Sequence, residues 1–246
     1  MKKGSLILTK MSEQLTLFDE KIFFNLHADY DEAQRTLHEL QKIGIVIGTD
    51  EAGRGALAGP VVAAAVFLTH EQEQALLKMN LRDSKLISPN RREKLFEAMK
   101  ELKVLWRACR GTPEMIDKEN ILQASLMTMG KSIQNLAKNL PDEKNIFVIV
   151  DGNSKINNIN FQQWNLIRAD KLIPVVSAAS IVAKVIRDKI MTNYHSKYPE
   201  YNFAQNKGYP TKFHIEAVKK FGLSDIHRKT FCRKLIQGGE NFNAVN

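Results

Sequence analysis

Short apolar runs recur along the chain and predict its strands. Residues 45–50 are rich in β-branched residues, too few for a helix and bounded by glycines, so they predict a buried strand. Four later runs of similar character predict further strands over residues 60–68, 104–110, 145–150 and 163–169. The run at 60–68 is close enough to the first strand to pair with it as a hairpin.

Between these runs, apolar positions recur at helical spacing. They predict helices over residues 28–42, 89–102, 113–139 and 174–197, and a shorter helix after Thr211. The helices at 89 and 113 each begin with a serine or threonine followed by proline, which supply an N-cap and a first helical residue. The alternation of strands and helices predicts an α/β fold.

The length of 246 residues suits one domain with a small appendage. We expect an N-terminal tail and helix over 1–43, a core over 44–200 and a basic helical segment over 201–246. No apolar stretch approaches the roughly 20 residues that span a bilayer, and the start lacks a signal-peptide core. We therefore expect a cytoplasmic protein without membrane contact. Nothing in the sequence demands a dimer, so we expect a monomer.

The formal net charge of +9 and the isoelectric point near 9.4 indicate a polyanionic partner. Residues 201–246 contain only three acids, and they are the expected electrostatic footprint for a nucleic-acid backbone. Their eight cations are Lys207, Lys212, Lys219, Lys220, Arg228, Lys229, Arg233 and Lys234.

Acidic residues stand at the ends of three predicted strands. Asp50 and Glu51 end the first strand, Asp151 follows the fourth and Asp170 the fifth. Because sites gather outside the strand ends of open α/β sheets, these four acids are expected to converge. Successive side chains of a strand point to opposite faces, so Asp50 and Glu51 share a site only if the strand stops or bulges there. The alternative interpretation is a solvated strand end followed by a tight turn.

Four clustered carboxylates would raise one another's pKa unless a cation binds among them. A hard divalent ion suits carboxylate oxygens, and two such ions about 4 Å apart can promote phosphoryl displacement. No serine or cysteine nucleophile with a partner histidine is evident, which makes covalent catalysis the weaker candidate. The residues therefore permit metal-assisted phosphodiester hydrolysis, while an acidic ion site without chemistry stays open as the alternative.

These residues belong to a set of motifs that resembles bacterial ribonuclease HII, the type 2 ribonuclease H, in order from about residue 45 to residue 231. The departures are small: Ala169 replaces a common glycine, and Thr230 replaces a common serine. The matching motifs are Gly48-Thr49-Asp50-Glu51-Ala52-Gly53-Arg54-Gly55, Gly59-Pro60-Val61, Asp83-Ser84-Lys85, Asn120-Ile121-Leu122-Gln123-Ala124, Val150-Asp151-Gly152-Asn153, Asp170, Ala179-Ser180-Ile181-Val182-Ala183-Lys184-Val185, Arg187-Asp188, Gly208-Tyr209-Pro210-Thr211, His214 and His227-Arg228.

The resemblance implies an RNase H-like mixed β-sheet flanked by helices, with a small helical C-terminal part. It implies an endonuclease that hydrolyses the RNA strand of RNA-DNA hybrids and incises 5′ of single ribonucleotides in duplex DNA, leaving 3′-hydroxyl and 5′-phosphate ends. Mg²⁺ or Mn²⁺ would be the cofactor. The acids that match the metal ligands of the family are Asp50, Glu51, Asp151 and Asp170.

The resemblance also implies substrate contacts. Gly53, Arg54 and Gly55 would read the ribonucleotide 2′-hydroxyl and its flanking phosphate, and Tyr209 would stack on the sugar after the RNA-to-DNA junction. The expected phosphate contacts are Lys85, Lys184, Arg187 and the C-terminal cations.

The N-terminal tail carries one more candidate motif. The segment Gln14-Leu15-Thr16-Leu17-Phe18 resembles the pentapeptide with which bacterial replication and repair proteins dock on the sliding clamp. Leu15, Leu17 and Phe18 would fill a hydrophobic groove while Gln14 forms a hydrogen bond at its edge. A tail that folds back on the domain is the alternative.

Two other functional classes are alternatives for this sequence. One is a noncatalytic nucleic-acid-binding protein with a structural ion, which the complete acid set and the glycine-rich turn disfavour. The other is a different RNase H-like metal nuclease, such as a junction resolvase or the type 3 enzyme. The type 3 enzyme has a separate N-terminal sheet domain, for which about 44 residues before the first strand are too few.

Overall fold

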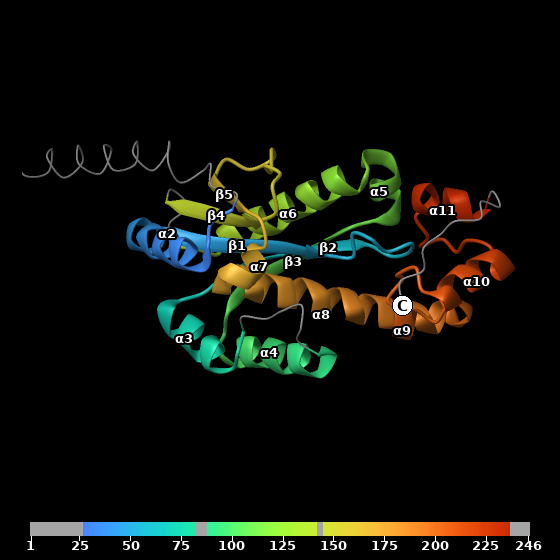
Figure 1. The fold of residues 1–246 in the computed structure, drawn as a ribbon, viewed down its shortest axis with the longest axis horizontal. Coiled ribbons are helices and arrows are strands. Elements are labelled where there is room, and N and C mark those ends of the chain that lie inside the picture. Colours follow the sequence, from blue (N-terminus) through green and yellow to red (C-terminus); the bar gives the residue numbers. More distant parts are fainter. Residues whose placement is uncertain (1–26, 82–87, 142–144, 237–246) are drawn as a thin grey trace, which may run out of the picture.

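A mixed five-stranded sheet organises the molecule (Figure 1). The computed structural model describes residues 27–81, 88–141 and 145–236. In the strand order β3-β2-β1-β4-β5, the β1–β2 and β2–β3 pairs are antiparallel and the β1–β4 and β4–β5 pairs are parallel. The strands are β1 (Ile45–Ala52), β2 (Val61–Phe67), β3 (Leu105–Gly111), β4 (Ile146–Asp151) and β5 (Gln162–Leu166).

Helices cover both faces of the sheet and form a separate group at one end (Figure 1). Among the described helices, none combines the length and apolarity that a membrane span requires. The helices are α2 (Tyr30–Ile43), α3 (His70–Lys78), α4 (Pro89–Glu101), α5 (Pro113–Glu119), α6 (Ile121–Ala137), α7 (Ala169–Leu172), α8 (Pro174–Lys197), the 3-10 helix η1 (Pro199–Tyr201), α9 (Phe203–Asn206), α10 (Lys212–Phe221) and α11 (Lys229–Ile236).

Alternation along the central strand divides the core in two. Val46 of β1 packs in the cluster that includes α8, α4 and α2, whereas Ile47 packs in the cluster that includes α6. This is the period of two that places successive strand side chains on opposite faces. At Gly48, an added Cβ would lie 2.6 Å from the backbone of Val175, so glycine is what lets α8 approach the centre of the sheet.

The C-terminal helices form a third apolar cluster with the loop after β1 and the end of α8. Asp117 of α5 fastens this group to the sheet domain, because its carboxylate accepts hydrogen bonds from the N–H groups of Lys229 and Thr230 at 2.8 and 2.9 Å. The Thr230 hydroxyl donates to the same carboxylate. A threonine in place of the common serine therefore keeps a hydroxyl in this contact.

Three predictions about local structure are wrong, and each has a local cause. Helix α3 was not predicted; Thr69 and Gln72 start it with a capping box. The single helix over 113–139 is two, because Asn120 has φ 64° and caps α6 with its own side chain. The fifth strand ends at Leu166 rather than 169. The backbone turns at Arg168 with φ 63°, so the residues after it begin α7.

Candidate active site

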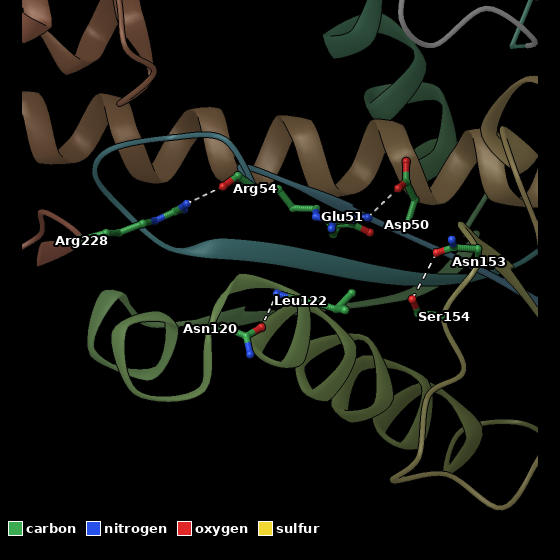
Figure 2. A network of polar contacts seen from close by, with 8 residues as sticks. All are labelled: Asp50, Glu51, Arg54, Asn120, Leu122, Asn153, Ser154 and Arg228. Carbon is green, nitrogen blue, oxygen red and sulfur yellow. Dashed lines mark hydrogen bonds and ion pairs between the residues drawn. The ribbon is translucent and has the colours of Figure 1, made fainter. Parts of the chain in front are cut away.

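The acid pair of β1 lies in a regular part of the sheet. Asp50 pairs with Ala64 and Glu51 with Ala63, and the ladder runs on to Ala52 without a bulge. The strand thus neither stops nor bulges at these acids, which was the condition set from the sequence for both to share one site. The charge of Glu51 nevertheless acts on Asp50. Their side chains leave opposite faces of β1, with Asp50 directed toward α8 (Figure 2).

Burial dominates the electrostatics of Asp50. Only 5% of this residue is exposed, and burial together with the charge of Glu51 raises the pKa of its carboxyl to about 7. Ser180 and Lys184 of α8 oppose this increase, the first through a hydrogen bond and the second through its charge. The Lys184 ammonium also donates to the Ser180 hydroxyl at 2.7 Å. Lys184 thus faces the acid site.

Glu51 interacts electrostatically with Asp151, which is distant in the sequence. Burial raises the pKa of its carboxyl, Arg54 lowers it and the charge of Asp151 raises it. Arg54 Nη1 lies 3.2 Å from Glu51 Oε1, and the arginine side chain is half-exposed. Because Thr49 pairs with Val150 in the parallel β1–β4 ladder, Asp151 closes β4 beside Asp50. The first three acids therefore gather at one end of two neighbouring strands.

Asp170 comes from a helix, α7, that packs against β4. It lies in the first turn of α7, fully buried, rather than at the end of a strand. Its backbone carbonyl accepts a hydrogen bond from the Ser177 hydroxyl of α8, which fixes α7 against that helix. Ala169 is also fully buried, so its methyl group is accommodated where the family has a common glycine.

The donor set suits a hard divalent cation. All four candidate ligands are carboxylates, which Mg²⁺ and Mn²⁺ accept, and the raised pKa values at Asp50 and Glu51 identify a place where added positive charge is favourable. Within the described residues, no three acidic, histidine or cysteine side chains are arranged closely enough to hold a metal ion. The fit therefore rests on the chemistry of the four acids and on the neighbouring strands β1 and β4, which carry three of them.

The turn after β1 is braced from behind. Arg228 of the C-terminal group donates from Nη2 to Gly53 O at 2.7 Å. It also donates from Nη1 to Arg54 O at 2.8 Å (Figure 2). Gly53 has φ 95°, and a Cβ there would lie 1.9 Å from Arg187 Nε. A Cβ on Gly55 would meet nothing within 4 Å. One glycine is thus required by packing, whereas the other faces open space.

Arg187, which the sequence predicts to contact a phosphate, is buried inside the protein. It is 1% exposed and donates to the carbonyls of Pro60 at 3.0 Å, Lys207 at 2.9 Å and Ala58 at 3.3 Å. Its guanidinium lies 5.1 Å from the ring centre of Tyr209, which is 38% exposed. The prediction of direct phosphate contact is therefore wrong, since the side chain is enclosed by backbone carbonyls.

Two other predictions about cations have different outcomes. Lys85 lies outside the described residues. Arg228, counted from the sequence among the cations of the electrostatic footprint, is fully buried and is therefore not part of a charged surface.

A pair of histidines, to which the sequence assigned no role, holds Tyr209. Ser224 N–H donates to His227 Nδ1 at 3.0 Å, so His227 Nε2–H donates to His214 Nε2 at 3.0 Å. His214 Nδ1–H then donates to Tyr209 O at 2.9 Å. Burial, reinforced by His214, lowers the pKa of His227 to about 4, and burial lowers the pKa of His214. Both rings are therefore neutral near pH 7 and anchor the tyrosine backbone.

Comparison with known proteins agrees with this geometry. The family model described as Ribonuclease HII matches residues 47–234. A ribonuclease HII of Desulfotalea psychrophila is 43% identical over 198 residues, covering 80% of this chain and 84% of the relative.

Solved structures share the fold. Bst-RNase HIII in complex with Mn²⁺ has a TM-score of 0.68 at 15% identity, with 82% of this chain and 72% of that chain covered. The PCNA:RNase HII complex from Archaeoglobus fulgidus has a TM-score of 0.62 at 25% identity, with 75% and 93% covered. The chain belongs to the ribonuclease HII family and is a metal-dependent endoribonuclease that hydrolyses RNA in RNA-DNA hybrids.

Proposed function

We propose that the chain incises duplex DNA on the 5′ side of single embedded ribonucleotides, in addition to cleaving the RNA strand of hybrids. The observation that carries this proposal is the position of the 53–55 turn, which begins two residues after Glu51 and is braced by Arg228. A group that reads a 2′-hydroxyl there would stand beside the acids that act on the adjacent phosphodiester. The biological roles would be ribonucleotide removal and RNA primer removal.

The acids would form the reaction centre. Asp50, Glu51, Asp151 and Asp170 would hold divalent cations, and such ions supply water activation and neutralisation of charge on the phosphate. The half-exposed guanidinium of Arg54 is free to turn from Glu51 toward an incoming phosphate. Lys184, which already faces Asp50, would balance negative charge at the same place. Cleavage would leave 3′-hydroxyl and 5′-phosphate ends.

Tyr209 would recognise the RNA-to-DNA junction. Its ring is partly exposed while Arg187 lies against it and His214 holds its carbonyl. A held aromatic ring offers a stacking surface to a sugar or base with little loss of side-chain freedom. Lys85 and the exposed C-terminal cations would contact phosphates farther along the duplex.

The proposed function is tested by cleavage of a DNA duplex that carries one ribonucleotide, beside an all-DNA duplex. Reactions with Mg²⁺, with Mn²⁺ and with chelator are compared. We expect metal-dependent incision 5′ of the ribonucleotide and no cleavage of the all-DNA duplex. Cleavage of a long hybrid without incision at the single ribonucleotide would overturn the proposal while leaving the family activity intact.

We further propose that residues Gln14, Leu15, Leu17 and Phe18 dock the enzyme on a sliding clamp, although they lie outside the described residues. The structure of the PCNA:RNase HII complex from Archaeoglobus fulgidus lends support to such an assembly. Deletion of residues 1–20 should end clamp binding in a pull-down with purified clamp and leave turnover of a short oligonucleotide unchanged. Clamp binding that persists in the deleted chain, or is absent from the full chain, would contradict the pentapeptide interpretation.

A further inference from the structure

Two arginines lie fully buried behind the 53–55 turn. Arg187 and Arg228, here called the buried arginine pair, are 1% and 0% exposed. Besides its bonds to Gly53 and Arg54, Arg228 donates from Nε to Gly59 O at 3.0 Å. Together with the bonds of Arg187 to Ala58 and Pro60, the pair engages five backbone carbonyls of residues 53–60.

These bonds determine which way the turn presents its N–H groups. The peptide bonds are trans, so each carbonyl points opposite to the N–H of the next residue. Because Gly53 O and Arg54 O point at Arg228, the N–H groups of Arg54 and Gly55 point away from it. Within the described residues, neither N–H donates a hydrogen bond to the protein. Two adjacent outward N–H groups can donate hydrogen bonds to the same anion.

The charge behind the turn is not neutralised by an ion pair. In the parts of the chain that the structure describes, no carboxylate lies within 4.0 Å of either guanidinium. Asp188 pairs with Arg92 at 3.5 Å, and Asp117 caps α11. Burial lowers the pKa of both arginines, and Arg187 further lowers that of Arg228, to about 9. The charge of Asp188 opposes this decrease at Arg187, and the charge of Asp117 opposes it at Arg228. Buried charges without a counter-ion are rare because desolvation is costly.

We propose that Arg228, reinforced by Arg187, is a positioning residue that aims the Arg54 and Gly55 N–H groups at a substrate phosphate and places positive charge beneath that phosphate. The phosphodiester is then the ion-pair partner that the described residues do not supply to these two guanidinium groups. This inference rests on the proposed function of the turn. It assigns no direct substrate contact to either member of the buried arginine pair.

The test separates charge from folding with two substitutions. Arg228→Gln removes the charge but keeps an amide donor, whereas Arg228→Lys keeps the charge and loses the planar fork. Arg35→Gln is the matched control, because Arg35 is an exposed cation of α2 at the opposite end of the molecule (Figure 1). Thermal melting verifies that each variant is folded.

The substrate is a long RNA-DNA hybrid, and its KM and kcat are measured at about 50 and about 200 mM salt. A hybrid is chosen because its cleavage is the family activity, so failure at single ribonucleotides does not compromise this test. We expect Arg228→Gln to raise KM roughly tenfold at low salt, as for the loss of one charge-assisted contact. The slope of log KM against log salt concentration should also decrease by about one, which corresponds to about one fewer released counter-ion.

Arg228→Lys should retain the salt dependence of the wild type, and Arg35→Gln should retain both KM and salt dependence. Equal KM and equal salt dependence in Arg228→Gln and Arg228→Lys would assign Arg228 to folding alone and overturn the proposal. A wild-type KM in Arg228→Gln would overturn it as well.

A measurement on the unaltered protein covers the case in which Arg228→Gln does not fold. Amide hydrogen exchange by NMR should be fast for the Arg54 and Gly55 N–H groups of the free chain, because they have no protein acceptor. It should slow when a non-cleavable hybrid binds. Slow exchange in the free chain, or no protection on binding, would contradict the outward orientation.

Discussion

Two buried charged groups of opposite sign flank one turn. On the β1 side, burial raises the pKa of Asp50 and Glu51 and so favours their neutral forms. Behind the turn, burial lowers the pKa of Arg187 and Arg228 and so favours the neutral forms of these two arginines. The acids come from strands and one short helix of the sheet domain, whereas Arg228 belongs to the C-terminal group, which Asp117 fastens to that domain.

The difference between these groups indicates what each one binds. A set of buried carboxylates is completed by a cation, and a buried arginine pair is completed by an anion. A divalent metal bound to a phosphodiester carries both charges at once. The 53–55 turn contacts Glu51 on one side and Arg228 on the other. This one turn would therefore position the phosphate relative to the metal. The variants below break one side of this arrangement at a time.

Asp50→Asn should have the largest effect. Loss of one acid should reduce hybrid cleavage on the order of 10³-fold, at the upper end of what removal of one electrostatic group costs. Hybrid binding should be retained, because the buried arginine pair is untouched. Asp31→Asn, an exposed acid of α2, is the matched control. Cleavage by Asp50→Asn at the wild-type rate would remove Asp50 from the metal site.

Gly55→Ala should follow, and it sharpens the contrast with Gly53. The added methyl group has open space and should leave the melting temperature unchanged. It would stand in front of the turn and reduce cleavage by up to about 10²-fold, because a displacement of about 1 Å at a reacting centre has that effect. Unchanged KM and kcat in this variant would show that no substrate group approaches Gly55.

Gly53→Ala provides the comparison on the protein side of the turn. Its methyl group would meet Arg187, and φ 95° disfavours any residue with a Cβ. We expect a loss of about 1–3 kcal/mol in the free energy of unfolding, as for other strained backbone positions. Chemical denaturation measures this loss, and a stability equal to that of Gly55→Ala would contradict the packing role of Gly53.

Tyr209→Ala should have a smaller and more selective effect. Loss of stacking should weaken incision at a single ribonucleotide roughly tenfold, since one stacked base contributes about 1–3 kcal/mol. Cleavage of a long hybrid should fall less, because junction reading is not needed there. Tyr209→Phe keeps the ring and serves as control. Equal losses on both substrates would argue against a junction-reading role.

The smallest effect concerns pH and the histidines behind Tyr209. His227 has a lowered pKa of about 4, so the folded chain binds fewer protons than the unfolded chain between about pH 6.5 and 4. Stability is therefore lost as the pH falls through this range. The melting temperature should fall by several degrees, given about 2–4 °C per kcal/mol in a chain of this size.

His227→Gln, which keeps a donor for His214, should be less sensitive to pH in this range. Among the described residues, the other ionisable groups near His227 are His214, whose pKa burial also lowers, Tyr201, which packs on its ring, and the residues that share its surface pocket. Those pocket residues are Glu114, Asp117, Lys118, Asp225 and Lys229. A wild-type pH dependence in His227→Gln would assign the effect to one of these instead.

Much of the fold was predictable because local signals and tertiary packing agree. The run at residues 45–50 is apolar and β-branched and becomes the central strand. The proline start signal at 174 is followed by the long helix α8 as expected. The break at Asn120 was missed because an apolar face continues on both sides of it, while the positive φ of one asparagine decides the break.

The candidate site was predictable for a different reason. Asp50, Glu51 and Asp151 follow apolar strand runs, so their placement could be inferred from the strand ends. The burial of Arg187 could not be inferred, because its acceptors, Pro60 and Lys207, are far away in the sequence. A cation that is enclosed by carbonyls of distant segments has the same sequence pattern as a cation on a helix surface.

The most direct test of two separate charge sites is a calorimetric titration of Mn²⁺ into the wild-type chain, Asp50→Asn and Arg228→Gln. Binding heat should be lost in Asp50→Asn and retained in Arg228→Gln, because only the acids would hold the ion. Equal Mn²⁺ affinity in the wild type and Asp50→Asn, or its loss in both variants, would contradict the separation of a metal site from a phosphate site.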